Sequence, residues 1–356
     1  MEKQNKTKRK IVLTLAVGLI GLLVIIGIAV YALGKGFYNN TNFMSDDSAM
    51  DDFVAMEDEE EIDPEDAAGE ILTPEQEAEL ERQLMDFSEA EPITNDGDVY
   101  NVLLVGVDRR DTSWAGNSDS MILMSLNYEK EQISMISLMR DTYVNIPGIG
   151  MRKLNAAHAN GAGPLLLETV TENFKVQVDR YASVDFNSMI DIVDAVGGVE
   201  LTLSSEEVRV ANNYIKEMCR LRGEEPTNHY YISEGTHNCS GIQAVAYARI
   251  RYVGHADYQR TERQRTVLTQ ILEKVKDMSI TELYSFVEEV LPLVTHNIPE
   301  DEMWNLLSKS PSILQYDLVK DRIPYDDLYK VVYVKRQDML VPYWEETIAK
   351  LKETIY

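Results

Sequence analysis

Cysteine, histidine, tryptophan and basic residues are scarce in this sequence. Its 356 residues include two cysteines, five histidines and three tryptophans, and 34 lysines and arginines face 60 aspartates and glutamates. Because the histidines are scattered and none shares a zinc-type spacing with a cysteine, the sequence argues against a zinc site. The formal net charge of −26 leaves no domain-wide basic field, which argues against nucleic-acid binding.

Two common catalytic motifs are absent as well. The chain has no Gly-x-Ser-x-Gly nucleophile elbow and no Gly-x-Gly-x-x-Gly loop, which argues against a serine hydrolase of that type and against a dinucleotide-binding domain. The function must therefore be sought in the residues that are present in clusters.

An uncharged apolar stretch at residues 11–33 is long enough to cross a bilayer. As a helix its 23 residues would extend roughly 35 Å. A cleaved signal peptide is the alternative, but its apolar part is usually shorter, about 7–15 residues. Five basic residues lie within residues 1–10 and only Lys35 follows closely, so the N-terminus should stay cytoplasmic. We therefore expect a single-pass cell-membrane protein with a cytoplasmic N-terminus at 1–10, a transmembrane signal anchor at 11–33 and an extracytoplasmic remainder.

The next segment, residues 34–98, is strongly acidic. Residues 46–98 hold 22 aspartates and glutamates and one basic residue, Arg82, a net charge of −21. Such a segment repels itself and has few apolar side chains to bury, which predicts an extended extracytoplasmic tether with at most a helical turn at 73–87.

Residues 99–356 have the pattern of a globular domain. The runs YNVLLVGV, SMILMSL and QISMISL have the length of strands, and FNSMIDIVDAVGG has helical spacing and ends at a Gly-Gly pair. Alternating strands and helices predict an α/β fold, an α-β-α layered domain with a central mixed sheet flanked by helices, preceded by one transmembrane helix. Residues 206–238 interrupt this alternation of strands and helices, and we expect them to form an excursion on the surface of the domain.

Both cysteines lie in or beside that excursion. Because exported proteins keep disulfides, we expect a Cys219–Cys239 bond that staples it. Two separate buried thiols are the alternative.

An arginine cluster occupies residues 246–264, AYARIRYVGHADYQRTERQ. An extended Arg249-Ile250-Arg251 would place both arginines on one face. A helix capped by Asp257 would add further polar residues at its first turns, where anions meet a favourable dipole. The arrangement suggests a pyrophosphate clamp, and a solvated charged face is the alternative. Its candidate members are Arg249, Arg251, Arg260, Arg263 and Gln264.

Two carboxylates follow and precede apolar strands in LLVGVDRRDTSWAGNSDSM. Asp108 and Arg110 leave the end of one strand, and Asp119 precedes the next. Ligands bind at strand ends in open α/β sheets, and one or two carboxylates suffice to hold Mg²⁺ beside a phosphate. A turn-forming role for Asp108 and a capping role for Asp119 are the alternatives, and the residues do not distinguish Mg²⁺ from Mn²⁺.

The ordered set of motifs resembles the LytR-CpsA-Psr family of cell-wall glycopolymer ligases. The set runs in the family's order over residues 99–275 and comprises GVDRR at 106–110, NSD at 117–119, RDT at 140–142, KLNAA at 153–157, VDAVGGV at 193–199, GIQAVAYARIR at 241–251 and DYQRTERQ at 257–264. The chain departs from the commoner family pattern at Asn117, where many members have arginine, and at Met139, where many have proline.

The resemblance implies a Mg²⁺-dependent, membrane-anchored phosphotransferase. It would transfer a glycopolymer from a polyprenyl-pyrophosphate carrier to a muramic acid hydroxyl of peptidoglycan. By motif position, the metal ligands would be Asp108 and Asp119, which with Arg140 would form the catalytic set. The pyrophosphate would be held by Arg110, Arg140, Arg249, Arg251, Arg260, Arg263 and Gln264. Asp141 and Asp257 are candidates for the base that accepts the hydroxyl proton.

Two other functions use the same residues. A pyrophosphatase would release the lipid-linked polymer to water with the same metal and arginines. A non-enzymatic cell-envelope module would only bind the anionic lipid, but it has little reason to bring two carboxylates toward a phosphate.

Overall fold

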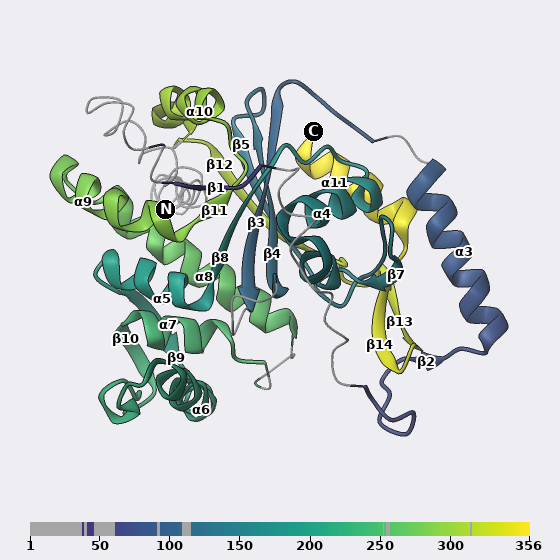
Figure 1. Ribbon diagram of the computed structural model, residues 1–356, viewed down its shortest axis with the longest axis horizontal. Helices are drawn as coiled ribbons and strands as arrows, with labels where there is room; N and C mark the ends of the chain where they lie inside the picture. Colours follow the sequence, from purple (N-terminus) through teal and green to yellow (C-terminus); the bar gives the residue numbers. More distant parts are fainter. Residues whose placement is uncertain are drawn as a thin grey trace, which may run out of the picture. The chain divides into compact units, whose positions relative to one another are not determined.

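A computed structural model describes residues 38, 41–45, 61–90, 93–108, 115–251, 253, 257–313 and 315–356. By its internal contacts the chain divides into two compact units (Figure 1). Of the described residues, the first unit comprises those that lie within Met1–Asn42 and Val184–Leu318, and the second comprises those within Phe43–Ser183 and Val319–Tyr356. The predicted globular part at 99–356 is therefore shared between two units, whereas the sequence suggested a single domain.

The predicted membrane anchor at 11–33 lies outside the described residues. Within the described ranges, no helix combines the length and the apolar character needed to cross a bilayer.

The second unit is built on a sheet in which the predicted apolar runs YNVLLVGV, SMILMSL and QISMISL form three neighbouring strands, β3 (Val99–Asp108), β4 (Asn117–Asn127) and β5 (Gln132–Leu138). In this sheet the strands lie side by side in the order β8 (Arg180–Asp185), β3, β4, β5 and β12 (Asp317–Ile323). β3 pairs with β4 and β4 with β5, both antiparallel. Both faces of β3 are buried, since Leu103 and Val105 alternate with the equally buried Val102 and Leu104.

Helices cover one of these faces. α4 (Ala156–Phe174) and α11 (Trp344–Ile355) both contact β4. Leu103 and Val105 share a core cluster with apolar side chains of both helices, such as Leu166 and Leu351, which are fully buried. A mixed α/β fold with a central sheet flanked by helices is thus confirmed.

The structure corrects the predicted boundary at residue 99. α3 (Pro74–Ala90) belongs to the second unit, where Leu80 and Leu84 are buried in its core. Glu81 pairs with Lys335 at 2.7 Å. The tether was predicted from the acidic composition, but the apolar residues of this segment recur with helical spacing on one face.

Short strands complete the second unit. β2 (Glu70–Ile71) pairs in parallel with β13 (Tyr329–Val334), which pairs antiparallel with β14 (Gln337–Pro342). β6 (Tyr143–Ile146) and β7 (Gly150–Lys153) form an antiparallel hairpin.

The first unit is mainly helical around a two-stranded ladder. The predicted helix α5 (Phe186–Ala195) begins at the cap Asp185 and is followed by Gly197 and Gly198, both with positive φ, as the Gly-Gly pair suggested. The ladder pairs β9 (Val199–Leu203) with β10 (Gly235–Cys239). The other elements are β1 (Asn42–Phe43), α6 (Ser205–Arg222), η3 (Pro226–Asn228), α7 (Gly241–Ala248), α8 (Asp257–Lys276), α9 (Ile280–Val290), η4 (Leu291–Leu293), β11 (Thr295–His296) and α10 (Glu300–Ile313).

The expected disulfide is absent from the structure. Cys219 and Cys239 are both buried free thiols. Cys219 lies in the last turn of α6, whereas Cys239 ends β10 and accepts a hydrogen bond from the Tyr231 hydroxyl at 3.2 Å. The excursion is instead held by its own caps, including a Ser204–Glu207 capping box at the start of α6.

Candidate functional site

The predicted acidic site lies at the end of the β3–β4 pair in the second unit. Asp108 is the last residue of β3 and lies opposite Asn117, the first residue of β4. The register shifts between Gly106 and Val107, whose partners are Ser120 and Ser118, so Asp119 is the extra residue of a β-bulge. Bulges re-aim side chains and are common beside active sites.

The close approach of the strands at this bulge favours a glycine. A Cβ at Gly106 would lie 3.0 Å from the Cβ of Ser120. The backbone before β4 is held by a buried histidine, because the Nδ1 of His158 lies 2.8 Å from the carbonyl oxygen of Gly116. Arg110, predicted to lie beside Asp108, falls outside the described residues.

A charged network connects Asp119 to two neighbouring elements. Arg140 donates from Nη1 to Asp119 Oδ1 at 2.8 Å, and its Nε lies 3.7 Å from Asp141 Oδ2. The other oxygen of Asp141 lies 2.8 Å from Nζ of Lys153, at the end of β7. All four side chains are at most 21% exposed. Two carboxylates and two cations thus alternate in a partly desolvated cluster.

Backbone hydrogen bonds fix the segment that carries this network. Asn155 donates its N–H to the carbonyl of Arg140, and Leu154 donates to that of Thr142. Leu340 donates to the carbonyl of Asp141. The sequence placed Arg140 and Asp119 in one site, and the structure brings them together. The prediction from the sequence did not include Lys153 among the site residues, although the KLNAA motif contains it. Asp141 was predicted only as a candidate base.

The arginine cluster belongs to the first unit, and its backbone differs from the prediction. Arg249 caps α7 with helical angles (φ −88°, ψ −8°) and is not extended. Its guanidinium lies 4.8 Å from the ring centre of Phe186 and 4.9 Å from that of Tyr214, and Nη2 lies 3.6 Å from Glu217. Arg249 is therefore held by two aromatic rings and one carboxylate, and its side chain is 15% exposed.

Arg263 holds the cluster's backbone. It is 5% exposed and donates to the carbonyls of Ile250 and Val253 at 3.1 and 3.2 Å. It also donates to the carboxylate of Glu207 at 2.9 Å and to the side chain of Gln259. The donors of Arg263 thus hold protein acceptors, so the structure gives it a role in holding the backbone, and its predicted role as a pyrophosphate ligand stays a prediction.

Glu207 is the carboxylate that compensates this buried charge. Burial opposes its ionisation, but hydrogen bonds from Ser204 and the Arg263 guanidinium hold the pKa of Glu207 below its usual value. The pair connects the start of α6 to α8 across 56 residues of sequence.

The remaining predicted members lie on the same two segments. Ile250 is fully buried, and Arg251, which follows it, is partly buried. On α8, Arg260 is 3% exposed and Gln264 is partly buried. Asp257, expected as the cap, is the first residue of this helix, and its side chain lies outside the described residues.

A family comparison classifies the chain. A model of the LytR_cpsA_psr family matches residues 66–350, which include the charged network, the arginine cluster and α3. The chain belongs to the LytR_cpsA_psr family. This membership confirms the family resemblance seen in the motifs.

Relatives in the LytR_cpsA_psr family include proteins named for teichoic acid transfer. The polyisoprenyl-teichoic acid–peptidoglycan teichoic acid transferase TagU of Bacillus licheniformis is 31% identical over 72% of this chain and 78% of its own. TagU of Enterococcus faecalis is 32% identical over 60% of this chain and 65% of its own. Biofilm regulatory protein A of Streptococcus mutans is 32% identical over 56% of this chain, and the match spans about half, 49%, of that relative.

Solved structures share the fold. Protein gbs0355 from Streptococcus agalactiae is 26% identical, with a TM-score of 0.60 over 72% of this chain and 88% of its own. TagT (YwtF), a LytR-CPS2A-psr family protein solved with bound octaprenyl pyrophosphate lipid, is 24% identical, with a TM-score of 0.53 over 75% of this chain and 95% of its own.

Proposed function

We propose that this protein transfers a glycopolymer from a polyprenyl-pyrophosphate carrier to peptidoglycan at the outer face of the cell membrane. The observation that carries the proposal is the partly buried Asp119–Arg140–Asp141–Lys153 network, formed by motif residues of a family whose named relatives are teichoic acid transferases. The apolar stretch at 11–33 supports a membrane anchor and an extracytoplasmic reaction.

The proposed reaction is an exchange of oxygens at phosphorus. A peptidoglycan hydroxyl oxygen forms a bond to the phosphorus next to the sugar, and the bond from that phosphorus to the bridging oxygen breaks. Polyprenyl phosphate leaves with the bridging oxygen, and a base takes the hydroxyl proton. Phosphoryl transfer needs positioning and neutralisation of developing charge, and little covalent help from the protein.

The second unit supplies the residues for that task. Arg140 presents a planar guanidinium, which matches phosphate oxygens, and its 2.8 Å contact with Asp119 fixes its direction. Asp141, between Arg140 and Lys153, holds both cations in place. An anion that reaches this cluster would meet cations whose orientation is already set, so little ordering is required on binding.

The donor set at the strand ends fits Mg²⁺. Asp108 and Asp119 would hold it, because both are carboxylates at the adjoining ends of paired strands and the bulge takes Asp119 out of the regular alternation. When bound, the ion would supply charge neutralisation at the pyrophosphate. Arg140 donates to Oδ1 of Asp119 at 2.8 Å, and this contact would orient the carboxylate toward the ion.

In the first unit, the arginines have separate proposed roles. Arg251, Arg260, Arg249 and Gln264 would contact the pyrophosphate, and Arg263 would keep their backbone in place through Ile250 and Val253. Arg249 would contribute as a stacked cation whose orientation is set by Phe186 and Tyr214.

An assay with defined substrates tests the proposal. The purified full chain in detergent would be incubated with a prenyl-pyrophosphate-linked disaccharide, peptidoglycan fragments and Mg²⁺, and products identified by mass spectrometry. We expect a phosphodiester-linked adduct, and Arg140→Ala should reduce its formation on the order of 100-fold or more, as for loss of one charge-stabilising donor. Arg82→Ala, in an exposed ion pair on α3, is the matched control.

The same assay separates the alternatives. Release of sugar phosphate at equal rates with and without peptidoglycan would identify a pyrophosphatase. Lipid binding without any turnover would identify a binding module. Either result would overturn the transferase proposal.

A further inference from the structure

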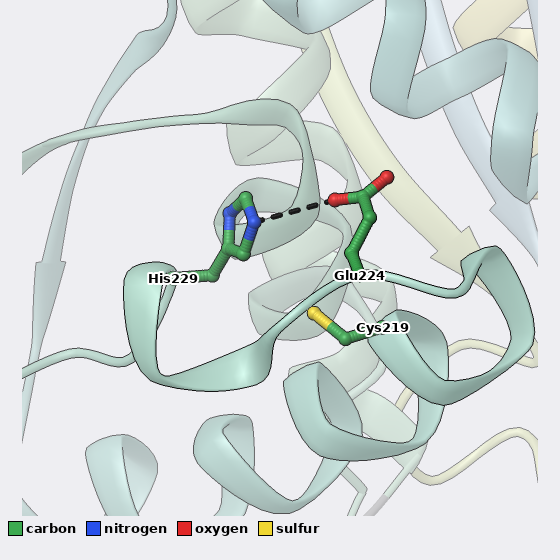
Figure 2. A group of neighbouring side chains, drawn as sticks. All are labelled: Cys219, Glu224 and His229. Atoms are coloured by element: carbon green, nitrogen blue, oxygen red, sulfur yellow. Dashed lines mark ion pairs between the residues drawn. The ribbon is translucent and has the colours of Figure 1, made fainter.

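Three side chains of different chemistry converge at the end of α6. The thiol of Cys219, the carboxylate of Glu224 and the imidazole of His229 each offer a ligand atom within 4.8 Å of the others (Figure 2). Among the described residues, no other group of three or more such side chains is gathered in this way. All three belong to the first unit and none is part of the proposed transfer site.

The local fold builds this cluster from residues only five apart in sequence. α6 ends at Gly223, which has the positive φ of a left-handed helix cap, and the N–H groups of Gly223 and Glu224 both return to the carbonyl of Cys219. The turn η3 then brings His229 back, with its N–H bonded to the carbonyl of Pro226. The far end of the loop is pinned by Asn212, whose side chain pairs with the backbone of Tyr231.

The carboxylate is oriented as metal ligands are. Arg222 holds Oε1 of Glu224 at 2.7 Å, so Oε2 points to His229, whose Nε2 lies 3.3 Å away. Ligating carboxylates are themselves hydrogen-bonded in this manner. An ion pair alone would explain Glu224 and His229, but it gives no role to the buried thiol of Cys219 beside them.

We propose that Cys219, Glu224 and His229 form a binding site for Zn²⁺ or a similar borderline-soft divalent cation. Thiolate, imidazole and carboxylate are the ligand types of zinc, whereas Mg²⁺ and Ca²⁺ take oxygen ligands. Three protein ligands leave a fourth position for water. The bound ion would tie the end of α6 to the following loop, which lacks the disulfide expected from the sequence.

Zinc binds cysteine as the thiolate, so binding would displace the proton of the Cys219 thiol. The prediction against a zinc site rested on the spacings between cysteines and histidines that are typical of zinc sites. The pattern Cys-x₄-Glu-x₄-His is not one of those spacings.

Cobalt titration of the purified, reduced full chain tests the proposal, because a thiolate bound to Co²⁺ gives a charge-transfer band that carboxylates do not give. We expect this band to saturate at one Co²⁺ per chain and to disappear when Zn²⁺ is added. Cys219→Ser should abolish it. Cys239→Ser removes another buried free thiol and is the matched control, which should keep it.

A histidine pair provides an independent comparison. His229→Gln should weaken Co²⁺ binding by at least the roughly 10–100-fold that loss of an outer-shell partner costs, whereas His237→Gln, whose ring contacts the Ser233 carbonyl, should bind as wild type. His229 is partly exposed, so this variant decides the matter if Cys219→Ser fails to fold. Absence of the band from the wild type, its persistence in Cys219→Ser, or wild-type affinity in His229→Gln would overturn the proposal.

Discussion

Replacing Arg263 with alanine should destabilise the first unit strongly. The substitution removes the donors that hold the carbonyls of Ile250 and Val253 and leaves the carboxylate of Glu207 without its guanidinium partner. The Arg263 side chain is 6% exposed and that of Glu207 16%, so little water replaces the lost contacts. Removing one partner of a buried ion pair costs about 3–5 kcal/mol, because the other charge stays behind in a desolvated position.

We expect a loss of about 3 kcal/mol in the free energy of unfolding, at the lower end of that range, since the carboxylate of Glu207 keeps its hydrogen bonds from the backbone N–H and the hydroxyl of Ser204. Arg263→Lys should recover part of it, because an ammonium can pair with Glu207 but cannot reach several acceptors in a plane. The measurement is urea denaturation of the full chain, with hydrogen exchange of the segment around residues 249–253 as the local readout.

The control is an arginine on the same helix as Glu207. Arg209 lies 4.0 Å from Glu206 in an exposed pair on α6, and Arg209→Ala should change stability by less than about 1 kcal/mol. If Arg263→Ala loses no more stability than Arg209→Ala, and exchange around 249–253 stays slow, the assignment of Arg263 to the protein interior is refuted.

Other predictions concern the N-terminal boundary, pH and the metal. Deleting residues 1–37, which precede Tyr38 and β1, should leave thermal stability unchanged, whereas deleting residues 1–98 should cost roughly 3–6 kcal/mol by uncovering the core under two buried leucines of α3; equal stability of both truncations would contradict the boundary. Burial lowers the pKa of His296 from 6.5 to about 4, so the unfolded chain binds the proton first and stability should fall by roughly 3 kcal/mol as the pH drops through this interval. His296→Gln should flatten that fall in pH-dependent denaturation, and an unchanged slope would assign it to other groups. Asp108→Asn should abolish Mg²⁺-dependent transfer but retain prenyl-pyrophosphate binding by calorimetry; full turnover in this variant would remove Asp108 from the metal site.

The strands of the second unit could be predicted because their sequence pattern is local. Runs such as YNVLLVGV contain enough apolar residues to bury both faces of a strand, and β3 and β4 follow them closely. The Gly197-Gly198 end of α5 was predictable for the same reason, since the positive φ of both residues favours glycine wherever the chain turns. The order of the motifs predicted that Asp119 and Arg140 belong to one site, but it did not predict the hydrogen bond between them.

The errors arose where a residue's partner is distant in sequence or where composition hid a pattern. The residues around Arg263 do not show that its charge is compensated inside the protein, because its partner Glu207 lies 56 positions earlier in the sequence. The acidic residues of α3 suggested a tether, although Leu80 and Leu84 are four residues apart and Phe87 follows three later, which is the spacing of a buried helix face. This apolar spacing was the signal in the sequence from which a buried helix could have been predicted.

The strong negative charge of the chain is compatible with binding a pyrophosphate because the acidic residues near the proposed ligands act as orienting partners. Asp119 directs Arg140, Glu217 holds Arg249 beside two rings, and Glu207 balances Arg263. Each pairing partly neutralises the positive charge of its arginine. It also fixes the arginine side chain before a ligand arrives, so less conformational entropy is lost when the ligand binds. Exposed carboxylates more than about 10 Å from a bound anion are largely screened at 0.1 M salt. The affinity for pyrophosphate should therefore depend on how these pairs fix the guanidinium groups, and far less on the net charge of −26.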